Sequence, residues 1–188
     1  MTMTPQQLSA ATGASISRAQ SWLKPIEDSM AAHGIDTPQR QAAFLAQIGH
    51  ESDHLLYTAE IWGPSAAQAR YGRRADLGNT KPDAIKKSGG NPGRFYKGRG
   101  LIQITGYDNY LRCGNALGLE LDVNPALLEQ KPYAALSAAW FWHSHGLNEL
   151  ADAGEFVKIT EIINGGHNGL ASREALYVAA KQAMEVAA

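Results

Sequence analysis

Apolar residues recur at helical spacing through the first fifty positions of the chain. Thr4-Pro5 and Thr37-Pro38 each place a capping hydroxyl before a proline, so we expect helices to begin at both. Between them, an amphipathic pattern predicts a helix over residues 15–33, which Pro25 is expected to bend or divide. The helix after Thr37 carries Phe44, Leu45 and Ile48 on one face, and Glu51 follows close to its C-terminal end.

The middle of the chain has a different pattern. Residues 63–100 are rich in proline and glycine, which predicts a long irregular segment of the kind that forms a cleft wall or lid. Residues 101–105 are rich in β-branched side chains and bounded by glycines, which indicates a short strand or extended segment. Three helices are expected afterwards, over residues 132–145, 155–163 and 171–186. No repeat or flexible linker appears, so we predict one mainly helical domain over residues 1–188.

Composition narrows the class of protein. The 188 residues are 44% hydrophobic and 19% charged, which is enough to bury a core and excludes a disordered chain. Cys113 is the only cysteine, so an internal disulfide or a four-cysteine zinc site is excluded. No apolar run approaches the ~18 residues of a membrane span. The N-terminus lacks a basic head followed by an apolar core, so we expect synthesis in a cytoplasm without a signal peptide.

Charge is unevenly distributed along the sequence. Residues 70–99 contain nine basic and two acidic residues, a net charge of +7, while the remainder carries −8. One interpretation is a solvated basic loop. The second is a patch that attracts an acidic polymer, such as a bacterial cell wall or nucleic acid.

One short motif suggests a metal site. His50-Glu51-Ser52-Asp53-His54 fits the H-E-x-x-H pattern, in which two histidines one helical turn apart bind zinc. A catalytic zinc requires a third protein ligand, for which Glu60 is the nearest acidic candidate. A zinc peptidase is therefore one hypothesis, beside the plainer interpretation of two structural histidines.

Glu51 also suits proton donation. The helix C-terminus and the adjacent apolar face both disfavour an ionised carboxylate, so Glu51 is expected to retain its proton near neutral pH. Glu60 lies nine residues further on and can face Glu51 across a cleft if the helix stops near residue 55. Two carboxylates in different environments are what glycosidic cleavage requires.

Side chains suited to holding a sugar cluster downstream. Tyr96, Trp62 and Tyr107 offer rings that stack on pyranose faces. The amides of Gln103, Asn109 and Asn164 can hydrogen-bond hydroxyl and acetamido groups. The run 140–142 (Trp-Phe-Trp) and Cys113 are interpreted as core residues.

Three blocks together resemble glycoside hydrolase family 19, the chitinase-like group that includes wall-lytic enzymes of phages and bacteria. They are residues 43–51 (AFLAQIGHE), residues 95–106 (FYKGRGLIQITG) with Asn109-Tyr110, and residues 162–166 (IINGG) with the segment 169–173 (GLASR). Their order and spacing agree over residues 40–180, and the central block is highly specific. The resemblance explains three blocks where the zinc motif explains one.

The resemblance implies a fold and a set of roles. The fold is mainly α and lysozyme-like, with two lobes, a deep cleft and little or no β structure. Glu51 corresponds to the general acid, Glu60 to the base that activates water, and Thr105 to the hydroxyl that helps place that water. Tyr96, Gln103, Asn109, Asn164 and Arg173 correspond to substrate-site residues, Arg173 lying near the acid. The nine-residue separation of the two glutamates matches the phage-type arrangement and not that of plant chitinases.

The function predicted from the sequence is an endolysin-type glycosidase that cuts the β-1,4 amino-sugar backbone of peptidoglycan with inversion. It is expected to reach the wall through a permeabilised membrane, to be a monomer, and to need no metal or other cofactor. Nucleic-acid binding and stable membrane insertion are not expected. A chitinase that uses the same residues is the nearest rival hypothesis, and a wall-binding module without turnover is a further one.

Overall fold

The first three helices begin at hydroxyl caps, two of which, Thr4 and Thr37, the sequence predicts. In the computed structural model, which describes residues 3–186, these helices are α1 (Pro5–Thr12), α2 (Ile16–Ala32) and α3 (Pro38–Glu51). In each, the cap oxygen accepts a hydrogen bond from the N–H three residues on; the caps are Thr4, Ser15 and Thr37. Pro25 lies inside α2 without dividing it. The missing hydrogen bond is offset by burial of Trp22 and Ile26 on the same helix.

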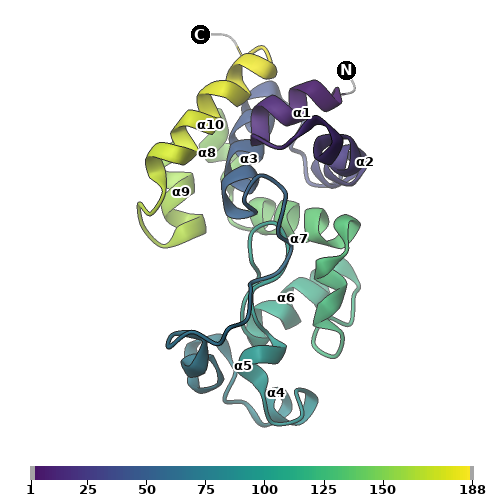
Figure 1. Ribbon diagram of the computed structural model, residues 1–188, viewed down its shortest axis with the longest axis vertical. Coiled ribbons are helices and arrows are strands. Elements are labelled where there is room, and N and C mark those ends of the chain that lie inside the picture. Colours follow the sequence, from purple (N-terminus) through teal and green to yellow (C-terminus); the bar gives the residue numbers. More distant parts are fainter. Residues whose placement is uncertain (1–2, 187–188) are drawn as a thin grey trace.

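The upper lobe in Figure 1 is a bundle around α3. Its other helices are α1, α2, α8 (Leu147–Asp152), α9 (Phe156–Asn164) and α10 (Leu170–Ala183). Residues 42–49 of α3 are all buried, which identifies this helix as the centre of the bundle. A Cβ at Gly49 would lie 2.7 Å from the Thr12 carbonyl oxygen, so only glycine lets α1 pack this closely beside the end of α3.

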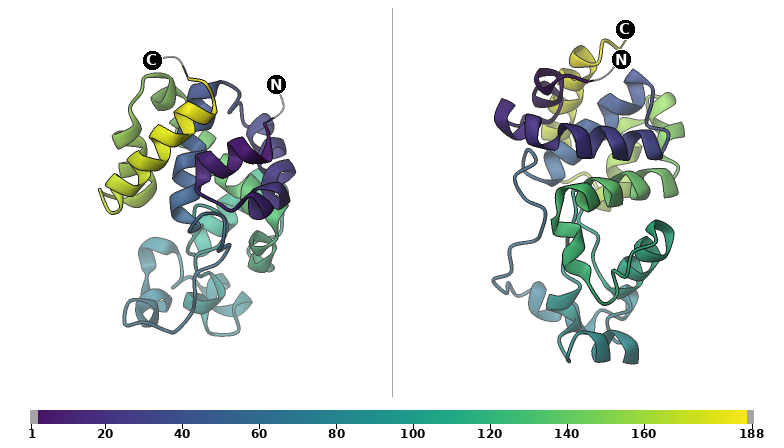
Figure 2. Two further views of the ribbon diagram at one scale, coloured as in Figure 1. Left: turned by 45° about the horizontal axis from the view of Figure 1, so that its top comes forward. Right: turned by 90° about the vertical axis from the view of Figure 1, so that its right-hand side faces the viewer.

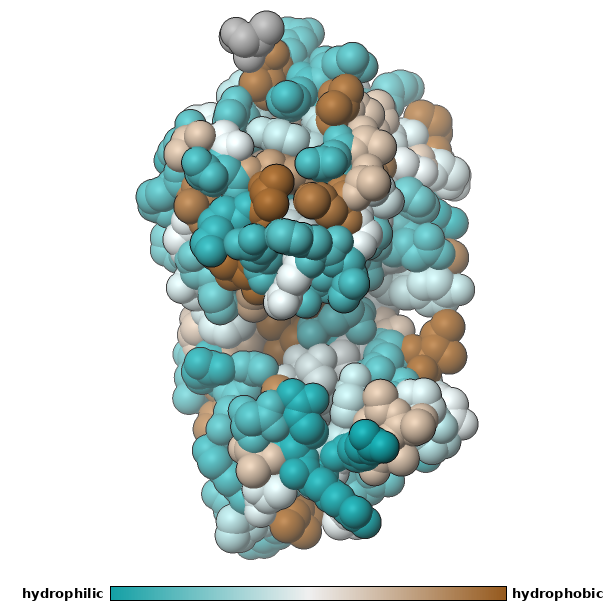
Figure 3. Space-filling view, turned by 90° about the vertical axis from the view of Figure 1, so that its left-hand side faces the viewer, coloured by the Kyte–Doolittle hydropathy of each residue, from teal (hydrophilic) through white to brown (hydrophobic). Residues whose placement is uncertain are grey.

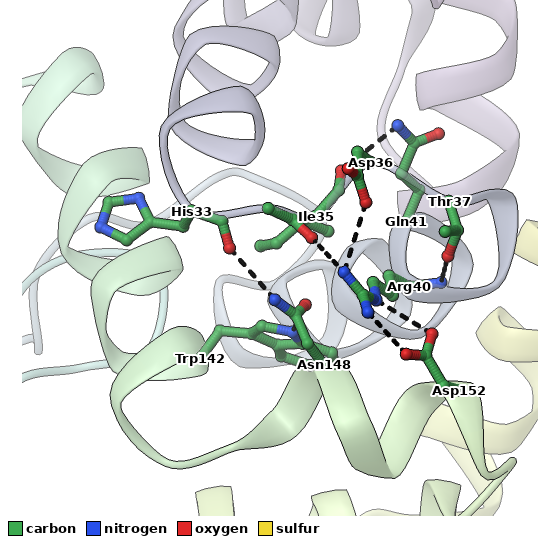
Figure 4. Close-up of polar contacts among 10 residues, drawn as sticks. His33, Ile35, Asp36, Thr37, Arg40, Gln41, Trp142, Asn148 and Asp152 are labelled. Carbon is green, nitrogen blue, oxygen red and sulfur yellow. Dashed lines mark hydrogen bonds and ion pairs between the residues drawn. The ribbon is translucent and has the colours of Figure 1, made fainter.

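Polar contacts anchor the beginning of α3 to α8 (Figure 4). Arg40 binds both carboxylate oxygens of Asp152, through Nε at 2.9 Å and Nη2 at 2.6 Å. Asn148 accepts a hydrogen bond from Trp142 Nε1 at 2.9 Å and donates to the His33 carbonyl at 3.1 Å. The Arg40–Asp152 contact fixes the start of α3 to α8, and the Asn148 bonds fix α8 to Trp142 and to the end of α2.

The lower lobe consists of short elements. It contains η1 (Gln68–Arg73), η2 (Ala75–Leu77), α4 (Pro82–Lys87), α5 (Pro92–Phe95), α6 (Tyr107–Leu117) and η3 (Pro125–Glu129). A second hydrophobic cluster fills it, centred on Tyr96, Tyr107, Tyr110, Cys113 and Leu128. The predicted irregular segment 63–100 is therefore a series of short helices joined by loops. The sequence pattern did not indicate α6 or α8.

Helix α7 (Lys131–Ser144) lies between the two lobes (Figures 1 and 2). Its alanines and Trp142 pack into the upper core. Tyr133, Trp140 and Phe141 pack against the lower cluster. A helix that is apolar on every face is buried between layers, and α7 joins the two cores in this way.

The predicted strand at residues 101–105 is wrong. The segment forms a tight turn closed by an isolated bridge between Arg99 and Ile104. Gly100 and Gln103 both have positive φ, +84° and +57°, which reverses the chain. The Leu101 N–H donates to the Ala134 carbonyl at 3.2 Å, so the turn docks on α7. This docking buries the apolar side chains that the sequence pattern assigned to a strand.

The remaining expectations concern the last three helices and the fold class. The predicted helices near 132–145, 155–163 and 171–186 correspond to α7, α9 and α10. The mainly α prediction is confirmed, because isolated bridges are the only β structure in residues 3–186. No helix in this range is long and apolar enough to cross a bilayer. Positions 1–2 and 187–188 of the predicted single domain lie outside the described residues.

Candidate active site

The chain reverses sharply after Glu51, the last residue of α3. Asp53, His54 and Leu55 all have left-handed backbone angles, with φ of +50°, +60° and +62°. Non-glycine residues seldom adopt this conformation, and such strained positions cluster at functional sites. Trp22 Nε1 donates to the Leu55 carbonyl at 3.1 Å, which holds the turn in place. The turn directs the chain from Glu51 towards the lower lobe.

A buried arginine contacts Glu51. Arg173 Nη2 on α10 donates to Glu51 Oε1, and Arg173 Nη1 donates to Gln47 Oε1. Gln47 in turn donates to Thr160 Oγ1 at 2.7 Å. The Arg173 side chain is 2% exposed and that of Glu51 is 18% exposed. The network therefore fixes the Glu51 carboxylate at the edge of the upper lobe while leaving one side open.

This contact corrects two expectations from the sequence. The family resemblance assigns Arg173 to the substrate site, but a side chain this buried positions Glu51 and has almost no surface for a ligand. The sequence pattern also predicts apolar surroundings for Glu51, whereas its nearest neighbour is the guanidinium of Arg173.

The two histidines of the zinc motif contact different elements. Helix α3 ends at Glu51, so the one-turn spacing of His50 and His54 does not exist in space. His50 Nδ1 is 3.1 Å from Ser172 Oγ, and His54 Nδ1 donates to the Thr12 carbonyl at 2.8 Å. Burial and the nearby Arg173 charge lower the pKa of His50. Residues 3–186 contain no group of three His, Cys, Asp or Glu able to hold a metal ion.

Neutral donors hold the Glu60 carboxylate, while the Lys97 ammonium donates to the Glu60 backbone carbonyl at 3.0 Å. Its Oε1 accepts hydrogen bonds from Gln68 Nε2 at 2.9 Å and from the Tyr71 hydroxyl at 3.2 Å. Its Oε2 accepts from the Gly98 N–H at 3.2 Å. Burial and the Glu60 charge raise the pKa of Tyr71, so the phenol stays a donor. Sequence reasoning missed Gln68 and Tyr71, whose spacing from Glu60 follows no recognised motif.

Gly98 brings three predicted site residues together. Its N–H binds Glu60, and a Cβ at this position would lie 2.6 Å from Gln103 Oε1 and 3.1 Å from Thr105 Oγ1. Glu60, Gln103 and Thr105 therefore converge on one glycine. Thr105 Oγ1 donates to the Gln103 carbonyl at 2.9 Å, which orients the hydroxyl.

The predicted amides lie on both lobes. Asn109 on α6 donates to the Thr105 carbonyl at 2.7 Å. Asn164 ends α9 in the upper lobe and donates to the Asn168 carbonyl at 3.3 Å. Their contacts with substrate stay a prediction.

Tyr96 is not a cleft residue. It has no exposed surface, and its hydroxyl donates to the Asp122 carbonyl at 2.7 Å. Edge contacts with Tyr107 and Phe95 place its ring in the lower core. The predicted stacking of Tyr96 on a sugar is therefore wrong, because the ring packs inside the second hydrophobic cluster instead of lining the cleft.

A cavity of about 340 Å³ lies beside these residues. Its lining includes Gln103, Thr105 and Asn109 from the predicted site, together with Trp140. Ile163 lines it from the upper lobe. Figure 3 shows the surface hollowed at the boundary between the lobes. A larger concavity of about 720 Å³ lies at α1, α2 and the start of α3, and its lining contains none of the predicted site residues.

The sequence of this chain is similar to those of known proteins. Residues 24–152 match the glycoside hydrolase family 19 model, described as chitinase class I. A Haemophilus influenzae protein described as containing a glycosyl hydrolase family 19 domain is 34% identical over 165 residues, 77% of this chain and 80% of its own. An Arabidopsis thaliana endochitinase is 35% identical over 148 residues. That match covers 78% of this chain and 47% of the endochitinase, so the chain spans about half of that relative.

Solved structures share the fold. Chitinase C from Streptomyces griseus superposes with a TM-score of 0.72 at 23% identity, covering 98% of this chain and 77% of its own. A bacterial family 19 chitinase superposes with a TM-score of 0.76 at 22% identity, covering 100% and 97%. The chain therefore has the two-lobed, lysozyme-like helical fold of these enzymes. It belongs to glycoside hydrolase family 19 and is a chitinase-type glycoside hydrolase.

Proposed function

We propose that this protein hydrolyses β-1,4 bonds between amino sugars, with Glu51 as general acid and Glu60 as general base. The observation that carries the proposal is the pair of carboxylates in opposite lobes with different partners. A cation contacts the Glu51 carboxylate, whereas the Glu60 carboxylate accepts hydrogen bonds from neutral donors. Two carboxyl groups in unlike environments are the minimum for this reaction.

In the proposed step, Glu51 transfers its proton to the bridging oxygen as the glycosidic bond breaks. Glu60 removes a proton from water, whose oxygen bonds to the anomeric carbon from the opposite face and inverts it. Arg173 favours the carboxylate that Glu51 becomes, so it stabilises the product of the proton transfer. Thr105 adjoins the glycine that binds Glu60, where its hydroxyl can help orient the water.

We propose peptidoglycan as the substrate. The lower lobe supports this choice because it exposes Arg70, Arg73, Lys86 and Arg94, none of which forms an ion pair within residues 3–186. Peptidoglycan carries carboxylates that such cations attract, whereas chitin is uncharged. Chitin is the second candidate, because several relatives are endochitinases.

The lytic role is part of the same proposal. An enzyme of this kind would act as an endolysin that reaches the wall through a permeabilised membrane. Co-expression with a membrane-permeabilising protein should lyse bacteria, and Glu51→Gln should prevent that lysis. Lysis by the variant at the wild-type rate would contradict the role of Glu51.

The deciding experiment compares purified peptidoglycan with chitin oligomers, using wild type and Glu51→Gln. We expect wild type to release muropeptides with new reducing ends, and mass spectrometry to show which sugar carries them. Proton NMR should show the inverted anomer first. Cleavage of chitin oligomers alone would identify the protein as a chitinase. If neither polymer gives new reducing ends, the proposal is refuted.

A further inference from the structure

Of the residues assigned to the reaction, Thr105 lines the cavity between the lobes, and Glu51 and Glu60 do not. Past Asn109 it is lined by Arg112 on α6 and by Trp140, Ser144 and His145 at the end of α7. No Asp or Glu among the described residues lines it. The larger concavity at α1 and α2, by contrast, has four acidic residues in its lining: Glu27, Asp28, Asp36 and Glu185. The part of the cavity lined by Arg112, Trp140, Ser144 and His145, called the extension below, therefore has basic side chains and no acidic ones.

Arg112 is a cation without a carboxylate partner within residues 3–186. Its Nη2 donates to Asn109 Oδ1, and Asn109 donates onward to the Thr105 carbonyl. Its Nε and Nη1 make no hydrogen bond within the described chain. Arg112 is thus tied to the sugar-site amide while its remaining donors are available to an acidic group.

Aromatic side chains form the facing wall. Trp140 is half-buried, and its Nε1 has no partner among the described residues, whereas Trp22 and Trp142 each bond theirs. The His145 ring stacks on Phe141 with centroids 3.9 Å apart. His145 Nδ1 donates to the Phe141 carbonyl at 2.8 Å, which holds the imidazole against that ring. Such aromatic rings can pack against the face of a sugar, and the free Nε1 of Trp140 can donate a hydrogen bond to a polar substituent on it.

We propose that this extension binds a carboxylate-bearing substituent of the amino-sugar polymer, with Arg112 as the pairing cation and Trp140 as the adjacent ring. The inference rests on the proposed function and makes Arg112 a specificity residue for acidic over neutral glycans. The carboxylate has two sources in peptidoglycan: the lactyl group of a peptide-free strand, and the stem peptide of a substituted one.

Binding is measured in the Glu51→Gln background, so no turnover is needed. Three ligands of equal length are compared: an N-acetylglucosamine oligomer, a peptide-free alternating strand with free lactyl groups, and the same strand bearing stem peptides. Arg112→Gln keeps an amide donor for Asn109 but removes the charge. We expect it to weaken one or both acidic ligands about fivefold and leave the neutral oligomer unchanged. The ligand that loses affinity identifies the source of the carboxylate.

Lys24→Gln is the control, because Lys24 is also exposed and lies outside both the cavity and the basic range 70–99. Equal weakening of all three ligands would show that Arg112 only positions Asn109. Equal effects of Lys24→Gln and Arg112→Gln would show a general charge effect, and an unchanged affinity in Arg112→Gln would show that Arg112 does not contact the ligand. Each of these results overturns the inference. Failure of the proposed function is a separate result, namely wild-type enzyme without turnover on either polymer.

Discussion

Arg173 and Glu51 lie 122 positions apart in the sequence, yet they form an ion pair in which the arginine is almost completely buried. The pair joins α10 to the end of α3 at the edge of the upper lobe. Because Arg173 also binds Gln47, one guanidinium orients the carboxylate and ties it to the core. Stability and turnover should therefore both depend on this arginine.

Arg173→Ala should destabilise the fold by about 3 kcal/mol, because it leaves Glu51 and Gln47 without their partner. Arg173→Lys should recover part of that stability, but a single ammonium cannot reproduce the two-pronged contact, so turnover should stay low. Guanidinium unfolding and initial rates measure the two effects. Wild-type turnover in the lysine variant would show that charge alone is enough.

Glu60→Gln should lower turnover by roughly 10²- to 10⁴-fold, because an amide cannot accept the proton from water. The amide oxygen still accepts the Gly98 N–H, so oligosaccharide binding should be retained. Glu120→Gln, at an exposed position in the same lobe, is the control. An unchanged rate in Glu60→Gln would remove this residue from the mechanism.

Thr105→Ala should reduce the turnover number about 10- to 100-fold with little change in KM, because the hydroxyl acts on water and not on the bound sugar. Thr105→Ser retains the hydroxyl and should restore most of the rate. Steady-state kinetics on a soluble oligomer separates the two parameters. A rise in KM alone would make Thr105 a substrate contact.

Chelators should leave activity unchanged, since α3 ends before His54 and the two histidines bind separate elements. Activity after dialysis against EDTA and the metal content of the purified protein provide the measurement. One bound zinc per chain, with activity that chelation abolishes and zinc restores, would favour the peptidase hypothesis.

Stability should fall at alkaline pH. Burial raises the pKa of the Cys113 thiol from 9.0 to about 12, and burial likewise raises the pKa of the Tyr96 and Tyr110 phenols. When a group has a higher pKa in the folded chain than in the unfolded chain, its contribution to stability is fully present below the unfolded-chain pKa and is lost as the pH rises towards the folded-chain pKa. From about pH 9 for the thiol and about pH 10 for the phenols, the unfolded chain therefore releases protons that the folded chain retains. Above these values, each group lowers the free energy of unfolding by about 1.4 kcal/mol per pH unit.

The unfolding midpoint in guanidinium, measured from pH 8 to pH 11, tests this expectation. Cys113→Ala removes one of the groups and should make the decline shallower. A midpoint that is constant up to pH 11 would contradict the assigned burial of these groups.

Local chemistry is sufficient to predict several features. The caps at Thr4 and Thr37 act within three residues, so the starts of α1 and α3 follow from the sequence. The same periodicity places Glu51 at the end of a buried helix. Helix α6 escapes prediction because Gly106 provides no capping side chain and its buried positions include two tyrosines. The specific blocks at 43–51 and 95–106 indicate the family, which the sequence matches support.

Other features depend on contacts between distant segments. Residues 101–105 include three β-branched residues, as a strand often does, but docking on α7 makes a turn more favourable. Tyr96 resembles a sugar platform until the second core closes around it. The convergence of Glu60, Gln103 and Thr105 on Gly98 depends on backbone approach, which no spacing rule contains.

The sequence by itself determined most of the longer helices, the family and the position of Glu51, because these depend on local bonding and on specific blocks of residues. Only the tertiary structure decided which side chains are buried and which face the cleft, since burial depends on what packs against each of them.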